Sequence, residues 1–375
     1  MRTTERRSPA FALRVFAFVG GALAVVVALA PHVWPRGEAP PRPHMLADGL
    51  LGNWLWWDGS WYLQIAQHGY SYHPHQQSSV AFFPLYPLVV RTVGWLFPVG
   101  TPLAAIAVTA ISGAVALTLF HRWCARRMTP AAARTAVVLL AVYPYAWFLY
   151  GAAYSDALFL SLVLGAFLVL EDDHPVWAGV LGALATAARP TGVAVVVGLG
   201  AVALHRHLAG HRRGAGVLLA AGGLGLWCAW LAVRFGNPFA FIETEGAPGW
   251  NQAPGFHTWF KVELVKNVAR YPVTGWIRLV PQALLCVAFL AALPAVNRLF
   301  GWGYATFVAA SVAVPTLATS DFMGAGRYLL LAFPVFALVG ERVADHRLAR
   351  PLVIGASSGL LLFATSLFAS GHLLS

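Results

Sequence analysis

The chain has 375 residues, of which 59% are hydrophobic and only 10% are charged. Soluble domains carry about 25% charged residues, so this composition excludes an ordinary water-exposed globular protein. The formal net charge of +11 does not indicate nucleic-acid binding. The arginines concentrate at the ends of apolar runs, where they set orientation in a membrane and meet anionic lipid headgroups.

Repeated apolar runs of about 18–20 residues predict an all-α polytopic membrane protein. We expect residues 1–375 to form a single transmembrane domain with eleven spans. The first run resembles a signal peptide but lacks a small-residue cleavage site, so we expect it to be retained as a span. The predicted spans are 12–30, 102–120, 132–152, 154–170, 176–189, 191–205, 215–235, 275–297, 302–319, 327–341 and 351–371.

Two long polar segments interrupt the apolar runs. Residues 31–101 are predicted to be a first extracytoplasmic loop with interfacial helices, and residues 236–274 a second large extracytoplasmic loop. The stretch 81–97 contains prolines and Arg91, so we expect it to lie along the interface without crossing. The basic His121–Arg127 loop then falls inside, as the positive-inside rule requires. This topology predicts a plasma-membrane protein with a cytoplasmic N-terminus and an extracytoplasmic active site.

The stretch from Trp54 to Tyr62 contains four tryptophans and one acid, Asp58. Read as one helix, it places Asp58 on the same face as Trp54, Trp57 and Trp61. Indoles collect at membrane–water boundaries, but a carboxylate without a partner costs several kcal/mol to desolvate. We therefore favour a chemical role for Asp58 as a general base, whose pKa partial desolvation would raise. The alternative is a structural ion pair or a helix cap.

Arg189 and Arg327 are each embedded beside apolar sequence at a predicted outer end. An arginine in a membrane is costly and usually has a partner or an anion to bind. Bidentate binding of a lipid phosphate is one use. Snorkelling to the interface, or an ion pair with Asp156 or Asp321, is the alternative. Asp156 itself begins a predicted span, which suits either a helix N-cap or a second acid in the same cavity.

The remaining polar clusters give weaker signals. His68, His73 and His75 lie in the first loop without nearby carboxylates, so we favour polar lining over metal ligation. The three cysteines have no metal-ligand spacing. Glu171-Asp172-Asp173 lies on the predicted inner side and is interpreted as a solvated turn. The loop 236–274 is long enough to be functional, and we expect it to cover the cavity.

Several blocks together resemble the PIG-V-like mannosyltransferases. They are Trp57-Asp58-Gly59 with Trp61-Tyr62, then Phe82-Phe83-Pro84-Leu85-Tyr86-Pro87, Tyr154-Ser155-Asp156, Arg189-Pro190-Thr191-Gly192 and Arg327-Tyr328. The resemblance implies a GT-C fold, in which a polytopic glycosyltransferase takes a sugar from a polyprenyl-phosphate carrier on the non-cytoplasmic face. The Arg/Ala/Gly/Val bias suggests a bacterial homologue, for which a lipid glycan, a cell-wall glycan or a protein is a more plausible acceptor than glycosylphosphatidylinositol.

The resulting hypothesis is an inverting mannosyltransferase that uses polyprenyl-phosphate-mannose, with Asp58 as the general base. No cofactor is expected, and no metal ligand is assigned, because a lipid monophosphate leaves with less charge than a nucleotide diphosphate. The expected partners are membrane lipids, the donor, and a glycan, glycolipid or protein acceptor, but no nucleic acid. The residues predicted to bind the donor phosphate are Arg189, Arg327, Tyr62, Tyr86 and Tyr328. Those predicted to line the substrate cavity are Trp57, Gly59, Trp61, His68, Tyr70, Phe83, Pro84, Tyr154, Asp156 and His257.

Two alternatives stay open at this point. A flippase or transporter of a lipid-linked glycan would also need embedded arginines and an aromatic cavity, although no internal repeat is evident. The same fold could also transfer another sugar, because selectivity among hydroxyl groups depends on pocket geometry.

Overall fold

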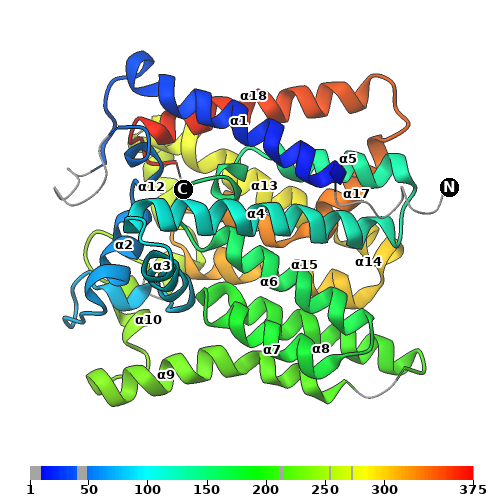
Figure 1. Cartoon of the computed structure of the whole chain (residues 1–375), viewed down its shortest axis with the longest axis horizontal. Coiled ribbons are helices and arrows are strands. Elements are labelled where there is room, and N and C mark those ends of the chain that lie inside the picture. The colour runs from blue at the N-terminus through cyan, green and yellow to red at the C-terminus, as the bar shows by residue number, and fades with distance from the viewer. Residues whose placement is uncertain (1–9, 40–48, 212–213, 253–254, 272, 375) are drawn as a thin grey trace.

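The structure is a computed structural model that describes residues 10–39, 49–211, 214–252, 255–271 and 273–374. Residues 40–48 of the predicted first loop therefore lie outside the described part. The described residues form a bundle of helices, and no strand is found among them (Figure 1). The helix α1 begins at one end of the bundle, and α18 ends at the other. The all-α prediction is confirmed.

The α-helices are joined by connections of very different lengths, the longest between α1 and α2. In chain order they are α1 Ala10–Val33, α2 Asp58–His68, α3 Leu85–Leu96, α4 Thr101–Ala125, α5 Pro130–Ala141, α6 Asp156–Glu171, α7 Pro175–Thr186, α8 Val193–Leu208, α9 Gly222–Phe235, α10 Ala240–Glu245, α11 Phe256–Trp259, α12 Val262–Arg270, α13 Val280–Ala291, α14 Leu293–Phe300, α15 Trp302–Ala318, α16 Ala325–Tyr328, α17 Phe333–Val343 and α18 Ala349–Ala369. Short 3-10 segments cover Gly52–Trp54, Ser79–Ala81, Ala146–Leu149, Pro190–Gly192, Ala215–Ala221 and Leu329–Leu331, and a π-helical segment covers Val273–Leu279.

Within the described ranges, five helices are long and apolar enough to cross a membrane. They cover Ala10–Val33, Thr101–Ala125, Pro190–Leu208, Ala215–Phe235 and Ala349–Ala369. A sixth span results if Gly275–Ala291 and Leu293–Phe300, which meet at an angle of 42°, are counted as one. All six coincide with predicted spans, so the chain is a multi-pass membrane protein.

The other five predicted spans contain shorter helices. The helices α5 and α7 have 12 residues each, which is about 18 Å of helix and less than the ~30 Å hydrocarbon core. Proline explains part of this shortening, because it cannot continue a helix from the preceding turn. Pro144 follows the end of α5, and Pro334 lies in the first turn of α17.

The two predicted external loops meet at one end of the bundle, where α2, α3, α10 and α12 gather around the end of α18 (Figure 1). The Tyr72 hydroxyl donates a hydrogen bond of 2.7 Å to Glu243 in the second loop. The backbone N–H of His75 donates to the same carboxylate at 3.2 Å. The stretch 81–97 contains only the 12-residue helix α3, which is too short to cross by itself.

The helix α6 forms the centre of the bundle and is buried on nearly all sides, with α4 and α7 packed against it. It begins with Asp156 and ends with Glu171, so each end of the core carries an acid. Glu171 contacts Arg127 and the Tyr304 hydroxyl. The prediction of a solvated turn is therefore wrong for Glu171, although Asp172 and Asp173 are exposed.

Candidate active site

Asp58 is the first residue of α2, at the end of the bundle where the two loops meet. Trp57 precedes it with a φ of 58°, which is not a helical conformation, so no helix can continue through this residue. The predicted continuous helix from Trp54 to Tyr62 is therefore wrong, and the break lies before Gly59. The Tyr154 hydroxyl explains the break, because it accepts from the Asp58 N–H at 3.1 Å and donates to the Trp56 carbonyl at 3.2 Å.

Arg327 provides the partner of Asp58. It lies in the one-turn helix α16, which follows Gly324 with a φ of 81°. Its Nη1 donates to Asp58 Oδ2 at 2.9 Å. The Arg327 side chain is 7% exposed and that of Asp58 is 36% exposed. The arginine is thus buried behind a carboxylate that keeps an accessible side. The ion pair considered as an alternative for Asp58 is present, and its partner is an arginine for which Asp156 or Asp321 had been considered.

A second ion pair extends the first. Arg189 Nη1 contacts Asp156 Oδ1, and both side chains are buried. The same Asp156 oxygen lies 4.0 Å from Arg327 Nε. The Asp156 Oδ2 and Arg327 Nε atoms have no hydrogen-bond partner among the described residues. Two acids and two arginines therefore alternate in one network whose formal charges cancel.

A small cavity of about 10 Å³ lies beside this network. Its lining includes Asp156, Arg189, Thr191, Arg327 and Tyr328. This volume is about that of one water, whose hydrogen bonds would satisfy the unpaired atoms. The side chain of Asp321 is placed elsewhere in its loop, where it accepts from the Met323 N–H at 3.0 Å.

Aromatic rings surround the two guanidinium groups. The Cζ atom of Arg327 lies 5.0 Å from the ring centres of both Tyr154 and Tyr328, and 5.3 Å from that of Phe148. The Cζ atom of Arg189 lies 4.9 Å from the Tyr328 ring. Cation–π contacts of this kind stabilise a desolvated guanidinium by roughly 2 kcal/mol. The structure thus brings the predicted residue Tyr328 to both arginines and Tyr154 to Arg327.

Tyr62 and Tyr86 lie near this network, and their hydroxyl groups bond to other residues. The Tyr62 hydroxyl shares a hydrogen bond of 2.9 Å with Ser155, the residue before Asp156. Burial raises the pKa of Tyr62 to about 12, so this hydroxyl stays protonated at neutral pH. Tyr86 is fully buried, and its hydroxyl bonds to the Ala105 carbonyl and to Thr109. Its position supports the packing of α3 on α4 more directly than phosphate binding.

An aromatic cluster of Trp61, Phe82 and Trp250 joins the two loops near the site. Trp61 stacks on Phe82 with 5.6 Å between ring centres, and Trp250 meets both rings edge-on at 5.9 Å. Trp250 belongs to the segment 236–274, so this segment packs against the first loop.

Other predicted cavity residues lie elsewhere. Trp57 donates from its indole to the His372 carbonyl at 3.3 Å, and the Tyr70 hydroxyl donates to the Phe82 carbonyl at 2.9 Å. Phe83 packs in a separate apolar cluster with Trp227 and Phe241. Pro84 precedes α3, Gly59 packs beside Ala153, and the His68 and His257 side chains are exposed. Within the described residues, no group of three or more His, Cys, Asp or Glu side chains could hold a metal ion.

Glu245, at the end of α10, is a further acid of the second loop, and it carries no distinctive signal in the sequence. Burial raises the pKa of Glu245 to about 7. The charge of Asp58 raises this pKa further and that of Arg327 lowers it, which places Glu245 within electrostatic reach of the pair. The sequence offers one indication that Glu245 is near the cavity. The residue belongs to the segment 236–274, which was expected to cover it.

Comparison with solved structures defines the class of the fold, which is GT-C. The structure is similar to that of ArnT from Cupriavidus metallidurans, with a TM-score of 0.51 and 13% identity. The match covers 96% of this chain and 76% of the ArnT chain. At this identity the likeness shows the fold alone, and it confirms the predicted fold class.

Residues 35–211 match the family described as Mannosyltransferase (PIG-V). GPI alpha-1,6-mannosyltransferase 2 of Cricetulus griseus is 34% identical over 172 residues, which are 43% of this chain and 34% of the relative. The Homo sapiens protein of the same name is 33% identical over 186 residues, 45% of this chain and 36% of the relative. The resemblance to the PIG-V-like mannosyltransferases is therefore confirmed, and the matched segment spans about a third of the length of these relatives.

Proposed function

We propose that this chain is an inverting mannosyltransferase of the plasma membrane that takes mannose from polyprenyl-phosphate-mannose. The acceptor is a hydroxyl group of a glycan, a glycolipid or a protein on the extracytoplasmic face. One observation carries the proposal: a partly exposed carboxylate, Asp58, is held by a buried arginine, Arg327, where two loops cover one end of the bundle. The family match and the GT-C fold support the reaction class.

In the proposed reaction, Asp58 removes the proton of the acceptor hydroxyl while the hydroxyl oxygen attacks the anomeric carbon of mannose. The bond from that carbon to the phosphate oxygen breaks, its electron pair stays on the lipid phosphate, and the anomeric configuration inverts. A positioned general base contributes about 10²–10⁴-fold to the rate. The contact with Arg327 fixes the direction of the carboxylate, which leaves one side of it free for the acceptor.

Arg189 and Arg327 are proposed to hold the leaving phosphate and to stabilise the charge that develops on it. Each guanidinium has five N–H donors, so contact with one carboxylate leaves donors for a phosphate. Arg327 Nε lacks a hydrogen-bond partner among the described residues. The cavity beside it has about the volume of one water, so a phosphate would have to displace side chains to reach this atom. The leaving group is a monophosphate, so this proposal does not require a divalent cation.

The test uses purified full-length protein in proteoliposomes with polyprenyl-phosphate-mannose and a membrane extract as the acceptor source. Asp58→Ala should reduce mannosyl transfer by about 10²–10⁴-fold. Azide is an anionic nucleophile that needs no base, so added azide should restore donor consumption by this variant and produce mannosyl azide of inverted configuration. Asp172→Ala, which removes an exposed acid, should behave like the wild type.

Four outcomes would contradict the proposal or part of it. Full transfer by Asp58→Ala would exclude Asp58 as the base. Retention of configuration in the product would exclude the inverting reaction. Movement of the lipid-linked sugar across the vesicle membrane without a covalent product would favour a transporter, and faster consumption of a donor carrying another sugar would reassign the donor.

A further inference from the structure

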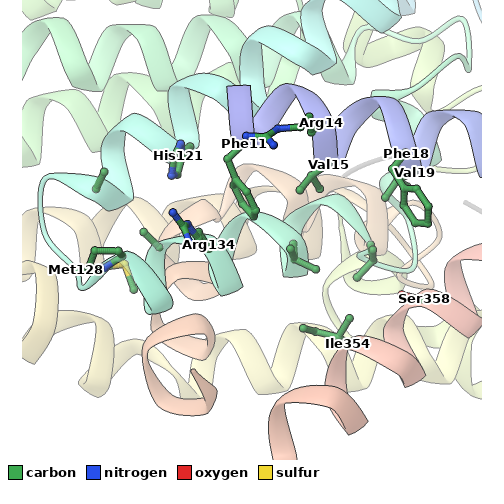
Figure 2. A pocket seen from close by; sticks show the side chains of 15 residues that line it. Phe11, Arg14, Val15, Phe18, Val19, His121, Met128, Arg134, Ile354 and Ser358 are labelled. Carbon is green, nitrogen blue, oxygen red and sulfur yellow. The ribbon is translucent and has the colours of Figure 1, made fainter. Parts of the chain in front are cut away.

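A groove of about 930 Å³ lies between α1, α4, α5 and α18 (Figure 2). It lies at the end of the bundle where α1 begins, whereas Asp58 lies at the end where α18 finishes (Figure 1). Its volume is in the range of cavities that hold a whole small molecule. The groove therefore cannot belong to the site of Asp58, and the proposed transfer reaction makes no use of it.

Three basic side chains lie at one end of this groove: Arg14, His121 and Arg134. Each lies four residues, or about one helical turn, from the end of its helix. These helix ends are Ala10 of α1, Ala125 of α4 and Pro130 of α5. Figure 2 shows Arg134 and His121 beside the Phe11 ring, whose centre is 5.6 Å from the Arg134 Cζ and 5.7 Å from the centre of the His121 ring.

Both arginines are exposed and keep free N–H groups. Arg14 uses only its Nε atom, which donates to the Ala10 carbonyl at 3.1 Å. In the part of the chain that the structure describes, neither Arg14 nor Arg134 has an acidic partner, and no acid lines the groove. This arrangement differs from the site of Asp58, where each arginine is neutralised by a carboxylate. An anion that the described residues do not supply would complete the groove.

The rest of the groove is apolar. Beyond the basic end, its walls are aliphatic and aromatic side chains of three helices, namely Val15, Phe18, Val19, Val138, Val142 and Ile354. From Arg134 in α5 to Val142, the residue that follows this helix, the wall extends about 12 Å. A free phosphate would leave these walls uncovered, whereas a neutral hydrocarbon would leave the arginines without an anion.

We propose that this groove is a binding site for a glycerophospholipid with an anionic headgroup. The phosphate contacts Arg14 and Arg134, whose guanidinium groups suit bidentate binding, and one acyl chain lies between α1, α5 and α18. Anionic lipids are concentrated in the leaflet that basic protein segments face. The bound lipid fills the gap between α1 and α5, so it stabilises the packing of the first helix against the bundle.

The test is native mass spectrometry of the full-length protein with phosphatidylglycerol and with phosphatidylcholine of the same acyl chains. Phosphatidylglycerol should bind more tightly and raise the melting temperature more. A cation near an anionic lipid contributes about 1 kcal/mol, so the double variant Arg14→Gln/Arg134→Gln should weaken phosphatidylglycerol binding by roughly 30-fold. The matched control, Arg347→Gln/Arg350→Gln, removes two exposed charges outside the groove and should bind as the wild type does.

A second variant tests the acyl chain without a change in charge. Val138→Trp fills the apolar part of the groove and should also reduce phosphatidylglycerol binding, and unchanged binding by this variant would overturn the placement of the chain. Equal affinity for phosphatidylcholine, or an equal loss in the control variant, would overturn the role of the arginines. Displacement of phosphatidylglycerol by an equimolar polyprenyl monophosphate would identify the ligand as a carrier lipid and reject the phospholipid.

Discussion

The Arg327 guanidinium lies 2.9 Å from the Asp58 carboxylate, although 269 residues separate the two in the chain. The contact joins the first turn of α2 to the one-turn helix α16. Because the arginine is buried and the acid is partly exposed, removal of the acid affects two properties. It takes away the proposed base, and it leaves a buried cation with one partner fewer. Experiments on this pair therefore need separate measurements of rate and of stability.

Asp58→Asn separates these two properties. The amide oxygen can still accept from Arg327 Nη1, but it cannot act as a base at neutral pH. We expect mannosyl transfer to fall by about 10²–10⁴-fold while the melting temperature changes little. Asp58→Ala, which also removes the acceptor, should lower the melting temperature more. An Asn variant that kept more than a tenth of the activity would contradict the proposed base.

Arg327→Met tests the buried network. The change leaves Asp58 and Asp156 facing each other with fewer cations, and loss of one partner of a buried ion pair typically costs about 3–5 kcal/mol. We expect a clear loss in the free energy of unfolding, measured by denaturant titration in detergent. Arg122→Met breaks an exposed pair with Asp172 and should cost less than about 1 kcal/mol. Equal losses in the two variants would show that the central network is not structurally important.

The raised pKa of Glu245 predicts that the stability of the protein depends on pH. Its pKa in the folded protein, about 7, is raised above the ordinary value of 4.5, mainly by burial. The folded state therefore holds this proton more tightly than the unfolded chain does, and the stability that this provides is lost as the pH rises from about 4.5 through about 7. Glu245→Gln should be as stable as the wild type near pH 5 and more stable at pH 8, as measured by melting temperature.

Glu243→Gln is the matched control for this titration. The pKa of Glu243 is lowered, first of all by the hydrogen bond from Tyr72, so its contribution has the opposite sign. It is present above the ordinary pKa of a glutamate and is lost as the pH falls. The melting-temperature difference between wild type and Glu243→Gln should thus shrink toward acid. A melting-temperature difference of the same sign at pH 8 for both variants would contradict the assigned environment of Glu245.

Trp250→Ala tests whether the second loop covers the site. The variant loses two aromatic contacts, with Trp61 and Phe82, each worth about 0.5–1.5 kcal/mol beyond the buried area. We expect a several-fold higher KM for the acceptor with a smaller change in kcat. Trp259→Ala removes a tryptophan that is 57% exposed in the same loop and should leave both constants nearly unchanged. A fall in kcat alone would point to a different role for Trp250.

Much of the fold could be predicted from the sequence because the cost of a polar group in a bilayer is local. An apolar run of about 20 residues can satisfy its backbone only as a helix, and the six helical segments of spanning length all coincide with such runs. The same argument singled out Asp58, Asp156, Arg189 and Arg327, because each is a charge placed in or beside apolar sequence. The sequence by itself thus determined which residues needed partners.

Only the tertiary structure decided which residues became those partners. Arg327 pairs with Asp58, and Arg189 with Asp156, because distant helices bring their ends together at one end of the bundle. The interruption of the helix at Trp57 depends on hydrogen bonds of the Tyr154 hydroxyl, about a hundred residues away in the chain. Glu245 gains its raised pKa from burial by other segments. Pairing and burial depend on how distant segments pack against one another. A local pattern of residues therefore does not predict them.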